Sequence, residues 1–104
     1  FILIPLEREE EIEIFNLVTP NGDGENDYWH IEGIDNTENE IKIFNRWGDK
    51  IVKTFINYNN SGNRWEGKND KNEILPDGVY FYIIKIKDKE TKTGWIYLRG
   101  KGSN

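Results

Sequence analysis

The chain has no cysteine, and only two serines and one histidine occur among its 104 residues. Without cysteine, neither a disulfide framework nor a thiolate zinc site nor a cysteine nucleophile can form, so stability has to come from packing. Ser61 falls in a polar loop, Ser103 falls in the tail, and His30 alternates with apolar residues on an expected strand. No Ser-His triad can be assembled from them. The many Asp and Glu leave a carboxylate pair for glycoside hydrolysis as an alternative, but nothing singles out one pair, and a small sandwich has little room for a substrate cleft. We therefore expect a protein that is not an enzyme.

Long apolar runs and an excess of basic residues are also missing. No run approaches the roughly 20 residues that cross a bilayer, and no signal-peptide pattern is present. The formal net charge is −5, and five glutamates crowd positions 7–13. Because a nucleic-acid binder needs a basic face for the phosphates, we expect no nucleic-acid partner. No set of residues points to a small-molecule substrate.

Short alternating segments separated by turn formers fill most of the chain. Four Trp, five Tyr and five Phe favour strands and supply large buried areas. No convincing helical period is present. The pattern predicts an all-β fold, an immunoglobulin-like antiparallel β-sandwich of about seven strands. The expected strands are 11–15, 28–34, 40–47, 51–56, 79–87 and 94–99.

The domain organisation follows from the same pattern. Residues 1–10 are either a linker or a first edge strand, and residues 11–104 are expected to form a single β-sandwich domain. Because Phe1 is not a start methionine, we expect a piece of a longer protein or a mature segment.

Two strands carry more detailed expectations. In 40–47, Ile41 and Ile43 are expected to face inward, with Trp47 as a further candidate. Residues 79–87 begin with an apolar stretch on both faces, which indicates a central strand covered on both sides.

The four tryptophans have two interpretations. They could form a platform for stacking sugars, but anchoring of the core and loops is favoured in a small chain without disulfides. Trp65, inside the polar stretch 57–73, is expected to fix that loop to the core. The four positions are Trp29, Trp47, Trp65 and Trp95.

The segment Leu75-Pro76-Asp77-Gly78 is a turn signal, because Pro76 fixes φ and Gly78 accepts a positive φ. Tyr80 follows this turn and opens a central strand. This is the tyrosine-corner position of immunoglobulin-like folds, in which the hydroxyl ties the turn to the strand. An ordinary core tyrosine is the alternative.

Residues 20–27, here named the glycine loop, combine turn formers with oxygen donors. Pro20 fixes one dihedral angle, Gly22 and Gly24 permit positive φ, and the Asn and Asp side chains can bond their own backbone. Near-alternate donors around two glycines also suggest calcium, although the EF-hand pattern fails. Either the carboxylates close the turn, or they bind calcium; no other cofactor is expected. The candidate calcium ligands are Asn21, Asp23, Glu25 and Asp27.

Four blocks in order point to a known family: Pro20 to Trp29, Ile41 to Gly48, Trp65 to Gly67, and Leu75 to Tyr82. Together they resemble the type B C-terminal sorting domain of the type IX secretion system, also called the gliding motility-associated C-terminal domain, of Bacteroidetes. The resemblance runs from about residue 15 to residue 99. The departures are small and lie at Glu66 and Val79, where the family commonly has Asp and Thr.

This resemblance implies a non-enzymatic secretion signal on an immunoglobulin-like sandwich. A large cargo protein, covalently linked on the N-terminal side, would cross the periplasm and then the outer membrane to reach the cell surface. The expected partners are the outer-membrane type IX translocon and a PorP/SprF-like outer-membrane protein. The rival interpretation is a calcium-stabilised adhesion or carbohydrate-binding module of a surface protein.

The residues of these blocks either form the surface that the partner recognises or recur because the fold needs its turns. They are Pro20, Asn21, Gly22, Asp23, Gly24, Asn26, Asp27, Trp29, Arg46, Trp47, Gly48, Leu75, Pro76, Asp77, Gly78 and Tyr80.

Overall fold

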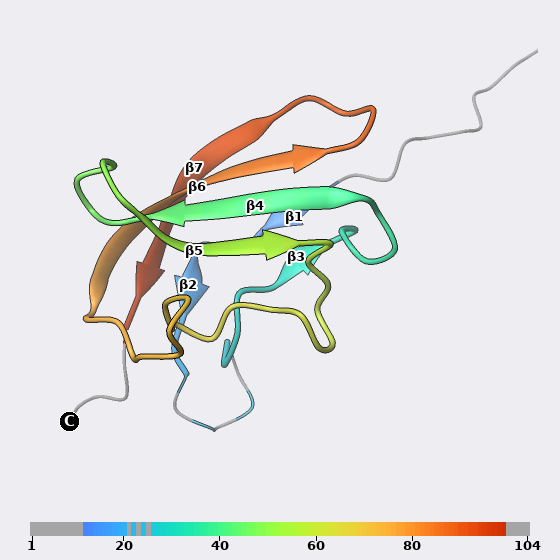
Figure 1. Ribbon diagram of the computed structural model, residues 1–104. Coiled ribbons are helices and arrows are strands. Elements are labelled where there is room, and N and C mark those ends of the chain that lie inside the picture. The colour runs from blue at the N-terminus through green and yellow to red at the C-terminus, as the bar shows by residue number, and fades with distance from the viewer. Residues whose placement is uncertain (1–11, 21, 23, 25, 100–104) are drawn as a thin grey trace, which may run out of the picture.

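The computed structural model describes residues 12–20, 22, 24 and 26–99. Every regular element within these residues is a strand (Figure 1). The strands are β1 (Glu13–Ile14), β2 (Leu17–Val18), β3 (Ile31–Glu32), β4 (Asn39–Phe44), β5 (Ile51–Ile56), β6 (Gly78–Ile86) and β7 (Lys92–Leu98). None of the described residues belongs to a helix that could cross a membrane. The prediction of an all-β fold with about seven strands is confirmed.

The strands form two sheets. The larger has the order β2-β7-β6-β4-β5, and β1 pairs with β3 in the smaller. The pairings β4 with β5, β4 with β6, and β6 with β7 are antiparallel, whereas β2 runs parallel to β7. In Figure 1, β3 and the long loop between β5 and β6 lie on one side of the larger sheet. This arrangement agrees with an immunoglobulin-like sandwich.

The core lies on that same side of the larger sheet. Side chains alternate along β4, β6 and β7, and every second one is buried. Full burial of one aliphatic side chain contributes about 1.5–3 kcal/mol to stability. The inward orientation predicted for Ile41 and Ile43 is confirmed. The buried strand residues are Ile41, Ile43, Tyr80, Tyr82, Ile84, Ile86, Ile96 and Leu98.

Aromatic residues from two loops close the core from the other side. Trp29, Tyr58 and Trp65 are buried, and the rings of Trp29 and Tyr58 meet edge to face at 5.7 Å. The Tyr58 hydroxyl donates to the backbone carbonyl of Trp29 and accepts from the backbone N–H of Trp65 at 2.9 Å. The prediction that Trp65 anchors its loop is therefore confirmed.

The outer edge of β5 is bonded to the loop that follows it. The backbone N–H of Asp70 donates to the carbonyl of Val52 at 3.0 Å, and the Asp70 carboxylate accepts from the N–H of Thr54 at 3.4 Å. Farther along, the Asn63 amide donates to the carbonyl of Ile56 at 2.8 Å. Several backbone groups on the outer edge of β5 are therefore already hydrogen-bonded within the same chain.

Two short strands depart from the sequence prediction. The strand expected over 28–34 is reduced to Ile31–Glu32, because the N–H of Trp29 donates instead to the carbonyl of Trp65 in a loop, at 2.9 Å. Leu17–Val18 was not expected as a strand, since two residues carry no period, yet Leu17 pairs with Tyr97 of β7.

Two orientation predictions are wrong. β4 ends at Phe44, so Trp47 falls in the following turn and 75% of its surface is exposed rather than facing inward. β6 is central in its sheet, but only one of its faces is covered: Val79 and Phe81 on the other face are 38% and 39% exposed.

Candidate recognition site

The turn between β4 and β5 displays Trp47 on a rigid frame. The carbonyl of Asn45 accepts from the N–H of Gly48 at 2.8 Å, and the Asn45 side-chain oxygen accepts from the N–H groups of Trp47 and Asp49 at 3.1 and 3.2 Å. Gly48 has a φ of +73°, which glycine adopts without strain. The exposed indole is therefore held by a fixed backbone rather than by a loose loop.

Arg46 connects this turn to the one before β6. Its guanidinium carbon lies 5.2 Å from the centre of the Trp47 ring, a cation–π contact. On its other side, Nη2 of Arg46 lies 3.6 Å from the point where a Cβ of Gly78 would stand. Gly78 also has a φ of +146°. A side chain at that position would be strained by this φ, although its Cβ would make only an ordinary contact with Arg46.

The turn over residues 75–78 is fixed at both ends. Leu75 packs against the core, and its N–H donates to the carbonyl of Gly67 at 2.9 Å. The Tyr80 hydroxyl donates to the carbonyl of Pro76 at 2.6 Å, which is the tyrosine-corner contact expected from the sequence. Burial raises the pKa of Tyr80, against the opposing effect of nearby Arg46.

The glycine loop is closed by Asp27. One carboxylate oxygen accepts from the N–H of Gly22 at 2.9 Å, and the other accepts from the N–H of Gly24 at 2.8 Å. The φ values of Gly22 and Gly24 are +79° and +86°, as the turn prediction requires. The other candidate calcium ligands, Asn21, Asp23 and Glu25, lie outside the described residues. Among the residues that are described, no group of three acidic or histidine side chains could hold a metal.

The structure brings only part of the predicted site together. Arg46 meets Gly78, whereas the glycine loop packs elsewhere: Pro20 and Leu98 lie beside Gly67, at 3.6 and 2.9 Å from the position of a Cβ on that glycine. Among the predicted residues, Trp29 and Tyr80 are buried; Pro20, Asp27, Leu75 and Gly78 are half-buried; Gly22, Gly24, Asn26, Arg46, Trp47, Gly48, Pro76 and Asp77 are exposed.

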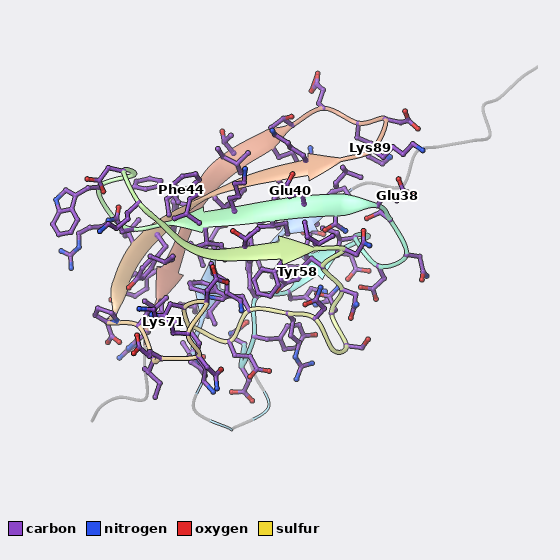
Figure 2. The ribbon with its side chains drawn as sticks, in the orientation of Figure 1. Glu38, Glu40, Phe44, Tyr58, Lys71 and Lys89 are labelled. Atoms are coloured by element: carbon purple, nitrogen blue, oxygen red, sulfur yellow. The ribbon has the colours of Figure 1, made fainter. Side chains whose placement is uncertain are left out.

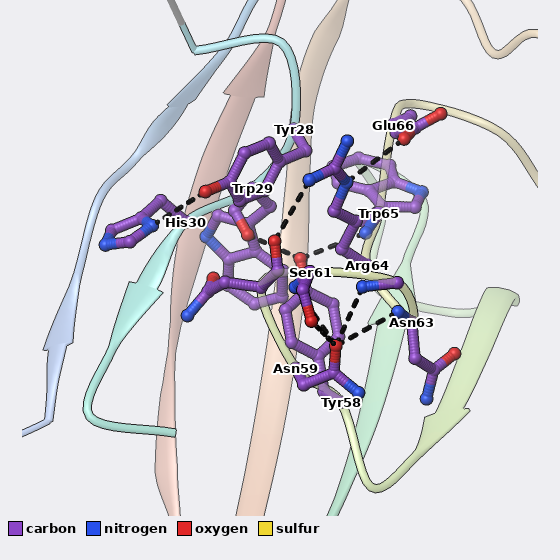
Figure 3. A network of polar contacts seen from close by, with 12 residues as sticks. Tyr28, Trp29, His30, Tyr58, Asn59, Ser61, Asn63, Arg64, Trp65 and Glu66 are labelled. Atoms are coloured by element: carbon purple, nitrogen blue, oxygen red, sulfur yellow. Dashed lines mark hydrogen bonds and ion pairs between the residues drawn. The ribbon is translucent and has the colours of Figure 1, made fainter. Parts of the chain in front are cut away.

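A polar network that sequence reasoning missed supports the loop aromatics (Figure 3). The Arg64 guanidinium carbon lies 4.2 Å from the centre of the Tyr28 ring, and its Nε is 3.2 Å from Glu66. The Tyr28 hydroxyl bonds Nδ1 of His30 at 3.2 Å, and Nε2 of His30 is 2.8 Å from Glu32. His30 is thus a packing residue, and it lies just before β3 rather than within a strand. No motif signals Arg64, because the ring against which it packs, that of Tyr28, comes from a different segment.

The exposed aromatic residues of the sandwich stand on a rigid turn and on one sheet face. Exposed Trp and Arg side chains on a fixed frame are typical of surfaces that bind other proteins. These features favour a recognition module.

Residues 12–98 match the family model of the CHU_C type IX secretion signal domain, and the chain belongs to this family. A comparison with curated proteins found no match. The family confirms the resemblance that the four sequence blocks indicate. The chain is a secretion signal domain, which implies a linked cargo, an interaction with the type IX secretion system, and export across the outer membrane toward the cell surface. An adhesion or carbohydrate-binding module is not favoured.

Proposed function

We propose that this domain is a non-enzymatic signal that the secretion machinery recognises at the turn surface formed by Arg46, Trp47, Pro76 and Asp77. The exposed indole of Trp47 carries the proposal. Trp and Arg are enriched among the residues that dominate binding energy at interfaces. A rigid frame lowers the entropy lost on binding, because the side chain is already positioned.

The partner of this surface would be an outer-membrane protein of the PorP/SprF kind acting with the translocon. This part of the proposal is supported by the resemblance to type B sorting domains. Attachment of the exported cargo at the cell surface belongs to the same proposal.

The Trp47→Ala variant tests the recognition surface. A fluorescent reporter with an N-terminal signal peptide is fused ahead of this chain and produced in hosts with and without a working type IX translocon. Loss of a residue that dominates an interface costs about 2 kcal/mol or more, so binding should fall about 30-fold and surface reporter should fall with it. Because Trp47 packs against little besides Arg46, the melting temperature should barely change.

The matched control is Ile56→Ala, which removes an exposed apolar side chain from the far end of β5. It should export like the unchanged domain. Normal export of Trp47→Ala would move the recognition surface elsewhere, whereas failure of the unchanged domain to depend on the translocon would remove the proposed function altogether.

We also propose that the glycine loop needs no calcium, because both oxygens of Asp27 are already bonded to backbone N–H groups. The melting temperature should be the same, within about 2 °C, in excess calcium and in a chelator. If the loop bound calcium, calcium at 100 times its dissociation constant would instead raise the free energy of unfolding by about 2.7 kcal/mol. Differential scanning calorimetry is the measurement. A melting temperature that rises with calcium and loses this rise in Asp27→Asn would restore the calcium interpretation.

A further inference from the structure

The face of the larger sheet that points away from the core is lined by apolar and aromatic side chains. One row crosses four strands, since Trp95 pairs with Phe81, Phe81 with Phe44, and Phe44 with Ile51. In Figure 2, Phe44 lies on the side of β4 away from Tyr58 and the core. Trp95 and Phe81 are 49% and 39% exposed, so the row faces solvent.

A second row adjoins the first. Leu17 pairs with Tyr97, and Tyr97 pairs with Val79. These two rows are here named the outer aromatic face, which consists of Leu17, Phe44, Ile51, Val79, Phe81, Trp95 and Tyr97. Because one aromatic side chain presents about 150–250 Å², the exposed fractions leave roughly 400 Å² of apolar surface open. Scattered apolar residues are ordinary on a surface, whereas a continuous patch of this size matches the largest patch of a typical monomer, which is often functional.

A groove of about 540 Å³ is hollowed into this face. It is lined by Phe44, Phe81, Ile83, Thr93 and Trp95, and it begins at Gly48 of the Trp47 turn. This volume lies within the range of small ligand clefts and admits one or two apolar side chains of a partner. The groove is therefore continuous with the surface on which the proposed function rests.

The charges on this face differ from those of the whole chain. Its strands contribute three charged side chains, those of Glu40, Lys42 and Lys85. The ammonium of Lys42 lies 3.7 Å from the carboxylate of Glu40, so these two charges balance and Lys85 gives the face a net positive charge. The chain as a whole carries a net charge of −5. A carboxylate on a partner would be attracted to this face. A second copy of the chain would be repelled by the shared negative charge.

We propose that the outer aromatic face is a docking surface for a protein of the secretion machinery that inserts one or two apolar side chains, flanked by carboxylates, into the groove. This inference rests on the proposed function and extends its surface from the Trp47 turn onto the sheet. Stable complexes bury about 800 Å² on each partner, a little over half of it apolar, so the open apolar area is close to what one partner of such a complex buries.

Substitutions at Thr93 test the groove without disturbing the core. Thr93 is exposed and lines the groove, so Thr93→Glu and Thr93→Lys should leave the melting temperature nearly unchanged. Both long side chains fill the groove, and only the glutamate would also repel a carboxylate of the partner. With the same reporter, we expect export to fall about tenfold in Thr93→Glu, less in Thr93→Lys, and not at all in the control Thr91→Glu, which changes an exposed threonine outside the groove.

Trp95 provides the second test. Trp95→Ser removes the largest side chain of the face and should lower export about tenfold, whereas Trp95→Phe, which keeps a ring, should restore most of it. Circular dichroism and melting of each purified variant establish that it is folded. If Trp95→Ser unfolds, the Thr93 pair decides alone.

Three results would overturn the inference. Normal export of Thr93→Glu and Thr93→Lys would show that the groove is not used, and lower export of Thr93→Lys than of Thr93→Glu would contradict a partner with carboxylates. A concentration-dependent dimer in sedimentation that is lost in Trp95→Ser would assign the face to a second copy of the chain. Flotation with vesicles of phosphatidylethanolamine and phosphatidylglycerol that is lost in the same variant would assign the face to lipid. If these variants export normally while Trp47→Ala fails, the proposed function stands and only this inference falls.

Discussion

Tyr58→Phe is expected to lower the stability of the domain by about 2–6 kcal/mol, although it removes a single oxygen atom. That oxygen donates to the carbonyl of Trp29 and accepts from the N–H of Trp65, both inside the core. Without it, two buried backbone groups lose their partner, and each costs about 1–3 kcal/mol. Because domains of this size are stable by only about 5–15 kcal/mol, the change removes a large share of the total. Urea unfolding followed by tryptophan fluorescence measures it.

Tyr97→Phe is the matched control, because its ring lies on the outer aromatic face and is 40% exposed. Its stability should change by less than about 0.5 kcal/mol. Equal unfolding midpoints for the two variants would contradict the role of the Tyr58 hydroxyl in joining the two loops.

Alkaline pH is expected to unfold the domain steeply. Burial raises the pKa of Tyr58, Tyr80 and Tyr82, so the folded protein keeps these protons after the unfolded chain has begun to lose them near pH 10. Stability from these groups is fully present below that pH. Above it the folded state binds more protons than the unfolded state, and the free energy of unfolding falls as pH rises. The slope from Tyr58 alone is about 1.4 kcal/mol per pH unit.

Unfolding curves at intervals between pH 9 and pH 11.5 test this prediction. In Tyr58→Phe the baseline stability is lower, but the loss per pH unit should be shallower, because one of the three buried phenols no longer titrates. Parallel slopes in the two proteins would mean that Tyr58 does not keep its proton in the folded state.

The strands that sequence reasoning identified are those long enough to carry a period. Ile41 and Ile43 alternate with polar residues in β4, and their inward orientation could be read directly. The two-residue strand β2 has no period and depends on a parallel contact with β7, a segment far along the chain. Apolar residues on both faces of β6 wrongly predicted a second covering layer, because an exposed apolar face and a covered face have the same composition.

For the candidate site too, residue patterns predict the position of some tryptophans correctly and of others wrongly. The prediction that Trp65 anchors its polar loop is confirmed. The prediction that Trp47 faces inward is wrong; it follows from extending the alternation of buried side chains in β4 to residue 47. The strand ends earlier, since Asn45 starts a turn held by its own side chain. Gly94 carries no turn signal at all; it is needed because a Cβ there would lie 2.5 Å from the Tyr82 hydroxyl. Contacts of this kind join residues that only the folded chain brings together.

The hydrogen bonds along the outer edge of β5 affect whether two copies of the domain can associate through this strand. An open edge strand invites another chain to add a strand, which leads to fibres and aggregates. Here three of the groups that a foreign strand would use are already bonded: the carbonyls of Val52 and Ile56 and the N–H of Thr54 bond to Asp70 and Asn63. These bonds hinder the addition of a strand from another copy of the domain at this edge.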